Sequence, residues 1–332
     1  MTILNKPLVS VLTPTWNRAS YLERVWNGLD SQTCRNFEWI IANDGSTDET
    51  ESVVRELSAR SNFPVVLINA SVHIGKPRMD NELIKHAGGE FIVWCDSDDY
   101  LTPHAIERLL DIWKTIPEND VAEYIGLTAL CADERGVMQS TLPPHEKVFD
   151  TTWNELSEKY HVHGDRLLFV RSDIVKKYKY VEVDFMIIES SVWGVLSDMR
   201  TRFIPEVLKI VDRETPNRIS FSGKMEYCRG KAYGIAIAEN IASRYKKKLT
   251  RRLWKAITYF RYCIHGEIGV SKAMKLWDGN LNPVVYLSMY PFGLLLAIKD
   301  VMQGKVRKTH REFDQARKNV SITVETLNVT KS

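Results

Sequence analysis

Cysteine is scarce in this sequence: five occur in 332 residues, and they form no C-x-x-C pair and no metal-ligand spacing. This spacing excludes a disulfide framework and a zinc module, and it is typical of a reducing compartment. The first seven residues carry one lysine and no apolar segment of the kind found in a secretory signal, so we expect a cytoplasmic protein. Neither G-x-G-x-x-G nor G-x-x-x-x-G-K-[ST] follows an expected strand, which argues against dinucleotide-binding and P-loop sites.

Acidic residues are few in the last third of the chain, although the net charge is only +3. Residues 1–222 contain 24 Lys and Arg against 34 Asp and Glu, whereas residues 223–332 contain 21 against 8. This asymmetry predicts two regions with a boundary near Ser220–Lys224, of which the basic one binds phosphate groups. Residues 244–255 (RYKKKLTRRLWK) are typical of an amphipathic helix at an anionic surface, although a solvated helix face has the same pattern.

Only residues 279–298 lack charge for long enough to span a bilayer as a helix. Pro283, Pro291 and Gly293 interrupt the run, and each proline removes a backbone donor. We therefore expect a broken, shallow insertion or a buried hairpin rather than a single span, with peripheral or monotopic attachment at the inner face of the cell membrane. From about Phe313 the chain is polar, which predicts a loose tail.

Strand and helix patterns alternate through the first hundred residues. The four expected strands are apolar and rich in β-branched or aromatic residues, and each is followed by a helical pattern or a capped turn. This alternation predicts an α/β fold with a mainly parallel sheet, in which ligands bind at the carboxyl ends of the strands. The expected strands are 8–13, 37–42, 64–69 and 91–95.

Three carboxylates follow the fourth expected strand within four residues: Asp96, Asp98 and Asp99. Mutual repulsion of like charges so close together requires a cation or solvent to offset it. Two carboxylates with room for substrate phosphates suit Mg²⁺ or Mn²⁺, although acidic helix-capping turns are also common. Asp44 ends the second strand in an N-D-G-S-T-D turn. There its carboxylate can accept a hydrogen bond from a nucleotide base or a ribose hydroxyl, or it can stabilise an Asx turn.

The order of these motifs resembles the family 2 glycosyltransferases of the GT-A fold, of the type that assembles bacterial cell-surface polysaccharides. The resemblance rests on Thr13-Pro14-Thr15-Trp16-Asn17-Arg18, residues 43–48, Gly75-Lys76 and Asp96-Ser97-Asp98-Asp99. It is strong over residues 7–115 and looser over 116–215. It implies a catalytic domain in residues 1–222, with a nucleotide-sugar half (7–115) and an acceptor half (116–222), and a helical, basic, membrane-associating extension in residues 223–332.

The resemblance implies an inverting transferase that uses a nucleotide-diphosphate sugar, with a UDP-sugar favoured, and a divalent cation. Asp44 would contact the base, Asp96 the ribose, and Asp98 the Mn²⁺ or Mg²⁺ that bridges the diphosphate. Lys76 would offset diphosphate charge, and Arg78 would do the same or lie exposed at a helix start. The remaining residues expected near the nucleotide are Thr13, Pro14, Asn17, Arg18 and Ser97.

The catalytic base is expected in the second half of the domain. Relatives carry Glu-Asp a few positions before a tryptophan, whereas this chain has Ile188-Glu189 before Trp193, so Glu189 stands in the aspartate's place. Glu189 is our candidate base, Asp184 is a substitute, and a helix N-terminal charge is the structural alternative. The expected acceptor or phosphate contacts are His163, Asp165, Arg166 and Trp193.

Two other functions remain open from the sequence. A sugar-phosphate nucleotidyltransferase would also use a parallel sheet and a metal, but it would carry a glycine-rich turn after its first strand. A non-catalytic, membrane-bound scaffold remains open because of the departure at Ile188. The expected partners are a nucleotide-sugar donor, a saccharide or lipid-linked acceptor and an anionic membrane; no nucleic acid is expected because the aromatic residues of the basic region lie in apolar company.

Overall fold

The structure is a computed structural model in which the chain forms two compact units. The first comprises residues 1–179, 196–215 and 315–332, and the second comprises residues 180–195 and 216–314. The residues that the structure describes are 6–143, 147–183, 187, 190–214, 228–242, 249–277, 282–305 and 320–328.

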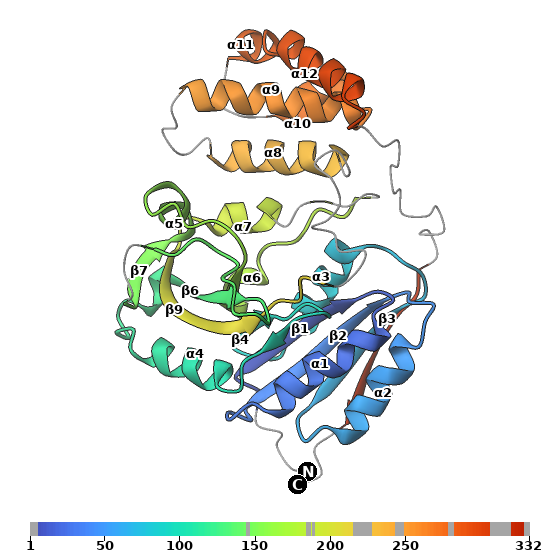
Figure 1. Cartoon of the computed structure of the whole chain (residues 1–332), viewed down its shortest axis with the longest axis vertical. Helices are drawn as coiled ribbons and strands as arrows, with labels where there is room; N and C mark the ends of the chain where they lie inside the picture. The colour runs from blue at the N-terminus through green and yellow to red at the C-terminus, as the bar shows by residue number, and fades with distance from the viewer. Residues whose placement is uncertain are drawn as a thin grey trace. The chain divides into compact units, whose positions relative to one another are not determined.

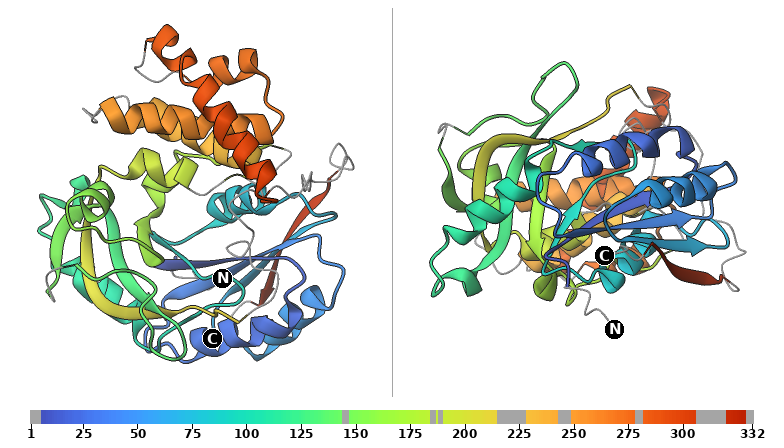
Figure 2. Two further views of the ribbon diagram at one scale, coloured as in Figure 1. Left: turned by 45° about the horizontal axis from the view of Figure 1, so that its top comes forward. Right: turned by 90° about the horizontal axis from the view of Figure 1, so that it is seen from below.

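Strands and helices alternate through the first part of the first unit, which confirms the predicted pattern (Figure 1). Every residue of β1 and β2 is buried, because α1 and α2 cover one face of these strands and α3 covers the other (Figures 1 and 2). The elements are β1 (Val9–Thr15), α1 (Ala19–Asp30), β2 (Phe37–Asp44), α2 (Thr50–Arg60), β3 (Val65–Ala70), α3 (Lys76–His86) and β4 (Phe91–Trp94).

The sheet continues beyond these strands in the order β10-β3-β2-β1-β4-β8-β6-β9-β5, and β7 pairs with β9. Pairing is parallel among β1, β2, β3 and β4, as expected, whereas β8 runs antiparallel to β4 and β6. The carboxyl ends of β1, β2 and β4 therefore lie at one edge of the sheet. The later elements are β5 (Tyr100–Leu101), α4 (Ala105–Lys114), η1 (Val121–Glu123), β6 (Tyr124–Ala132), β7 (Phe149–Thr152), α5 (Trp153–Glu158), β8 (Arg166–Arg171), α6 (Ser172–Val175), β9 (Arg200–Ile210) and β10 (Ile322–Asn328).

The expected loose tail from about Phe313 is wrong for its last part, because residues 322–328 form β10. This strand runs antiparallel to β3, and the Asn328 carboxamide accepts from the Val65 amide at 2.8 Å. Arg55 on α2 bonds Glu325 at 3.0 and 3.2 Å. The polar composition that suggested a tail reflects an edge strand whose residues are mostly exposed.

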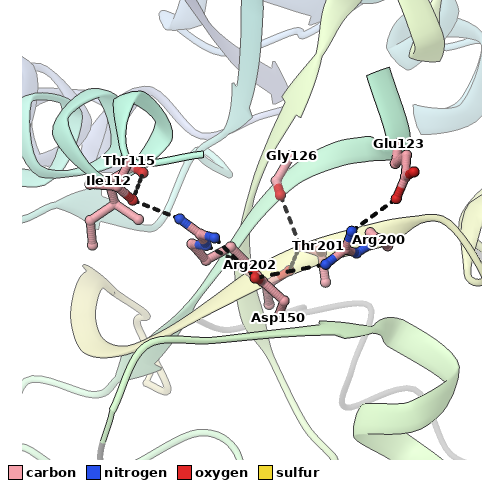
Figure 3. Close-up of polar contacts among 9 residues, drawn as sticks. Ile112, Thr115, Glu123, Gly126, Asp150, Arg200, Thr201 and Arg202 are labelled. Carbon is pink, nitrogen blue, oxygen red and sulfur yellow. Dashed lines mark hydrogen bonds and ion pairs between the residues drawn. The ribbon is translucent and has the colours of Figure 1, made fainter. Parts of the chain in front are cut away.

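The start of β9 is held by a group of polar side chains (Figure 3). Arg202 forms a two-pronged ion pair with Asp150 on β7, at 2.7 and 2.9 Å, and also bonds Thr115 at 2.7 Å. Arg200 bonds Glu123 at 2.8 Å. Hydrogen bonds from Arg202 hold the pKa of Asp150 below its usual value, although burial opposes the shift. These contacts fix β7 against β9 and α4.

The second unit is helical. Its core contains small residues of α8 and aromatic residues of α9, among them the fully buried Tyr259 and Phe260, which pack against Tyr286 of α11. The helices are α7 (Ser190–Leu196), α8 (Cys228–Ala242), α9 (Leu249–His265), α10 (Val270–Leu276), α11 (Pro283–Leu287) and α12 (Tyr290–Met302).

The uncharged run of residues 279–298 is broken, as the prolines predicted. α11 ends at Leu287, a turn occupies Ser288 and Met289, and α12 begins at Tyr290. Residues 283–302 together are long and apolar enough to cross a membrane by length and composition, but only 22% of the apolar window is buried. A buried hairpin therefore does not describe this segment. Of the predicted amphipathic segment, residues 249–255 lie in α9, and residues 244–248 lie outside the described residues.

Candidate active site

The turns that follow β1 and β2 are bonded to each other. The Asn17 amide donates to the Ser46 hydroxyl at 2.9 Å, and the Asn17 carboxamide oxygen accepts from the Thr47 amide at 2.8 Å. Asn17 has a φ of 51°, a backbone conformation that asparagine tolerates better than most residues. These bonds form one continuous loop surface at the carboxyl edge of the sheet.

Asp44, at the end of β2, bonds the loop that precedes α3. Its buried carboxylate accepts from the backbone amides of Ile74 at 2.6 Å and Gly75 at 2.8 Å, and it lies 2.9 Å from Nδ1 of His73. The His73 ring stacks on Trp16 with ring centroids 4.0 Å apart, and 41% of Trp16 remains exposed. Asp44 thus fixes the loop that precedes α3 and orients a stacked aromatic pair.

Lys76 links the G-K-P-R turn to the acidic turn after β4. Its ammonium lies 3.1 Å from the buried carboxylate of Asp80, one helical turn further along α3, and 3.8 Å from Asp96. The family resemblance implied only that Lys76 would offset diphosphate charge. The structure brings the two segments together, so that positive charge lies next to carboxylates at the edge where β1 and β2 also end.

The last residue of the acidic turn, Asp99, has a structural role. Its carboxylate lies 3.0 Å from the ammonium of Lys209 on β9, and both side chains are almost fully buried. Burial raises the pKa of Asp99 to about 6, with Asp96 and Asp98 adding to the shift and Lys209 opposing it. Burial alone would lower the pKa of Lys209, but Asp99 raises it well above its usual value. This pair anchors the acidic turn to β9.

Asp96 and Asp98 are both half-buried, whereas Ser97 between them is buried. Among the residues that the structure describes, no group of three or more His, Cys, Asp or Glu side chains surrounds a metal position. Mg²⁺ and Mn²⁺ at diphosphate sites need only one or two carboxylates, because phosphates and water supply the other ligands. The two accessible carboxylates therefore fit such an ion, bound together with a substrate.

The remaining residues expected near the nucleotide differ in accessibility. Thr13 is buried, and its hydroxyl accepts from Trp39 at 2.9 Å and donates to the Cys95 carbonyl at 2.8 Å, so its side chain holds the sheet together. Pro14 is buried at the end of β1. Arg18 is half-buried and lies 5.5 Å from the Tyr21 ring, and Arg78 is half-buried in the first turn of α3.

The expected acceptor residues occupy two places. His163 and Asp165 are exposed; the His163 amide donates to Thr141 at 2.8 Å, and Asp165 pairs with Arg213 at 3.0 Å. Arg166 bonds the Val162 carbonyl, and burial lowers its pKa. Trp193 lies half-buried on α7, in the second unit. Glu189, Asp184 and Ile188 lie outside the described residues.

Sequence reasoning missed three residues at this site. Trp16 was part of the first motif, but nothing in its pattern distinguished an exposed aromatic from a core residue. His73 pairs with a carboxylate 29 positions away, and Lys209 pairs with one 110 positions away, so no local pattern connects them. A lysine within the otherwise apolar stretch Val207–Val211 was the available signal, because lysine is almost never fully buried unless it is paired.

Comparison with known proteins gives matches to glycosyltransferases. Residues 10–163 match the family model described as Glycosyl transferase family 2. The chain is 30% identical over 179 residues to the putative glycosyltransferase EpsH of Bacillus subtilis, an alignment that covers 50% of this chain and 51% of that protein. It is 39% identical over 104 residues to the chondroitin synthase of Pasteurella multocida, which covers 31% of this chain and 11% of that protein. The chain thus spans between about a tenth and about half of these relatives.

Solved structures support the same fold. TarS of S. aureus (residues 1–349), in complex with UDP-GlcNAc, aligns with a TM-score of 0.56 at 16% identity, over 95% of this chain and 96% of that one. The mannosyltransferase PcManGT of Pyrobaculum calidifontis, in complex with GDP-Man and Mn²⁺, aligns with a TM-score of 0.52 at 17% identity, over 90% and 88% of the two chains. These alignments show the GT-A fold.

Proposed function

We propose that this chain, whose residues 10–163 match the family 2 glycosyltransferases, transfers a sugar from a nucleotide-diphosphate sugar to an acceptor hydroxyl with inversion at the anomeric carbon. The observation that carries the proposal is Lys76, which places a cation between the loop before α3 and the acidic turn of Asp96. A diphosphate needs this combination of a cation and metal-binding carboxylates at one edge of the sheet.

The nucleotide base is assigned to the loop surface formed by Trp16, His73 and Asn17. An exposed aromatic side chain that is already held by a stacked neighbour provides a rigid platform for a planar base, and stacking of this kind contributes about 1–3 kcal/mol. Asp44 holds this platform in place through His73 and two backbone amides. We favour a UDP-sugar, and the UDP-GlcNAc complex of TarS is consistent with that preference.

The diphosphate is assigned to the acidic turn and the start of α3. Asp98 would ligate the divalent cation and Asp96 would face the ribose, while Lys76 and Arg78 offset the remaining phosphate charge. A bound Mn²⁺ or Mg²⁺ would supply stabilisation of the charge that develops on the leaving phosphate. PcManGT was solved with GDP-Man and Mn²⁺, which supports a metal at this place.

Glu189 is the proposed base, because it stands in the place of the aspartate that relatives carry before a tryptophan, and a carboxylate can accept the proton of the attacking hydroxyl. His163, Asp165, Arg166 and Trp193 are the proposed acceptor contacts. The acceptor is a saccharide or a lipid-linked saccharide in surface polysaccharide assembly at the cytoplasmic face of the cell membrane. The match to a chondroitin synthase supports a polysaccharide product.

The test is a screen of nucleotide sugars with Mn²⁺ or Mg²⁺, which measures thermal stabilisation and released nucleoside diphosphate. We expect one nucleotide class to stabilise the protein in a metal-dependent manner. Asp98→Ala should abolish this stabilisation, whereas Glu189→Ala should retain it and lose about 10²–10⁴-fold in turnover. Asp111→Ala, at an exposed carboxylate on α4, is the matched control and should change neither quantity. Absence of binding with every nucleotide and metal would contradict the transferase and favour the scaffold.

A further inference from the structure

α11 and α12 carry many exposed apolar side chains. The most exposed are Val284 (76%) and Met302 (82%), at the two ends of the segment. A soluble monomer rarely leaves so many large apolar residues of one segment in water. We call this set the apolar face; it consists of Val284, Leu287, Phe292, Leu295, Ile298 and Met302.

The opposite side of α12 is fixed to α9. The buried residues Gly293, Ala297 and Asp300 are spaced by four and three positions, so they form one stripe along the helix. A Cβ added at Gly293 would lie 2.7 Å from the Cβ of Phe260, which shows how closely α12 crosses α9 (Figure 2). The apolar face cannot turn inward without breaking this contact.

An ion cluster around the buried carboxylate of Asp300, at the end of α12, adds to this anchoring. Both carboxylate oxygens of Asp300 accept from the Arg261 guanidinium at 2.5 Å, and Nε2 of His265 lies 3.1 Å from one of them. Moving α12 alone across a bilayer would break these contacts and leave the Asp300 charge unpaired. Moving α9 with it would carry several arginine and lysine side chains into hydrocarbon.

The exposed charges of residues 282–305 are of one sign. Asp300 is the only acidic residue between positions 282 and 305, and it is buried, whereas Lys299 and Lys305 are exposed. Trp254 on α9 is 60% exposed, although it belongs to a basic segment. Exposed apolar side chains accompanied by exposed lysines, in a helical unit that also exposes a tryptophan, match a surface of anionic lipid headgroups over acyl chains.

We propose that α11 and α12 lie in the plane of an anionic membrane, with the apolar face inserted at the level of the headgroups and the first acyl carbons. The partner is the lipid surface itself, and the segment attaches to one leaflet without crossing it. This attachment involves only the helical unit and does not depend on sugar transfer, so vesicle binding is measured without any nucleotide sugar.

The first test is flotation of the full chain with vesicles of phosphatidylcholine and phosphatidylglycerol, compared with phosphatidylcholine alone. We expect binding to the anionic vesicles that weakens with added salt, and at least about tenfold weaker binding for Leu295→Glu, because a buried leucine side chain contributes more than the free energy of a tenfold change. Val137→Glu is the matched control, since Val137 is an exposed apolar residue of the first unit. It should bind as the unchanged protein does.

Several outcomes would overturn the proposal. These are no vesicle binding by the unchanged protein, equal binding to neutral vesicles, or an equal loss in Val137→Glu. Light scattering provides a further check, because a dimer that Leu295→Glu converts to a monomer without change in vesicle binding would identify the apolar face as a contact between two copies. Circular dichroism of the variant confirms that the helices are retained.

The second test separates an in-plane segment from a spanning one. Asn282→Cys and Gln303→Cys, at exposed polar positions that flank the apolar face, are made in a Cys34→Ser background, where the other four cysteines are buried. The proteins are bound to preformed vesicles and treated with a membrane-impermeant thiol reagent. An in-plane segment has both ends on the outer side, so both cysteines should react without detergent. Reaction of only one end until the vesicles are lysed would show a span and overturn the in-plane arrangement.

Discussion

Lys209→Met should strongly destabilise the first unit, because it removes the partner of a buried carboxylate. The Lys209 ammonium lies 3.0 Å from Asp99, and the two side chains are 9% and 4% exposed. Loss of one partner of such a pair costs about 3–5 kcal/mol of unfolding free energy, since the other charge remains buried and uncompensated. For a domain of this size, that corresponds to a decrease in Tm of about 6–20 °C.

The effect should depend on pH. With a pKa of about 6, Asp99 in the unchanged protein ionises between pH 5 and 7 beside Lys209. Without Lys209 its folded pKa rises further above the unfolded value, so the folded state retains a proton that the unfolded chain releases. The variant should therefore lose more stability at pH 8 than at pH 5.

The assay is urea denaturation followed by circular dichroism at both pH values. Arg108→Met is the control, because Arg108 and Glu206 form an exposed ion pair at 2.6 Å, and such pairs contribute about 0–1 kcal/mol. Lys209→Met combined with Asp99→Asn should recover part of the loss. A loss below about 1 kcal/mol for Lys209→Met, or one independent of pH, would refute the reasoning.

Three further predictions concern other parts of the chain. Gly45→Ala should destabilise by about 1–3 kcal/mol in thermal unfolding, because φ is 63° and a Cβ would lie 2.2 Å from the backbone of Val72; an unchanged Tm would contradict this. Trp16→Ala should weaken nucleotide binding about 5- to 150-fold by calorimetry, and unaltered affinity would remove Trp16 from the site. Hydrogen bonds from Arg261 and His265 hold the pKa of Asp300 below its usual value, against the effect of burial. The ionised Asp300 should therefore stabilise the folded state above about pH 4, and an acid titration by circular dichroism should show that this stabilisation is lost at lower pH. Asp300→Asn should lack that acid-dependent step.

The sequence predicted the first half of the fold well because its signals are local. Apolar runs such as 37–42, followed by turn residues and helical periodicity, identify strands and helices without knowledge of their partners. β10 was missed for the opposite reason. Ile322, Val324 and Thr326 alternate as in a strand, but the segment is short and polar, and its partner β3 lies about 250 positions earlier.

The candidate site was predicted as a set of positions rather than as a set of contacts. The motifs placed Asp44 and Asp96 at the ends of strands, and the structure has both strand ends at one edge of the sheet, since parallel strands bring their carboxyl ends together. They did not show that the Thr13 hydroxyl is used in hydrogen bonds within the sheet, or that the His73 ring stacks on Trp16. Such roles depend on side-chain packing between segments far apart in the chain, which a single sequence does not encode in any short pattern.

The pairing of β10 with β3 has a consequence for synthesis of the chain on the ribosome. The outer edge of β3 is complete by Ala70, but its partner appears only with Ile322. At a synthesis rate of about 5–20 residues per second, the edge of β3 stays unpaired for roughly 10–50 seconds before β10 is made. During that interval its free backbone groups offer a template for other chains. A premature stop within the helical unit would make that exposure permanent, so truncated copies should aggregate.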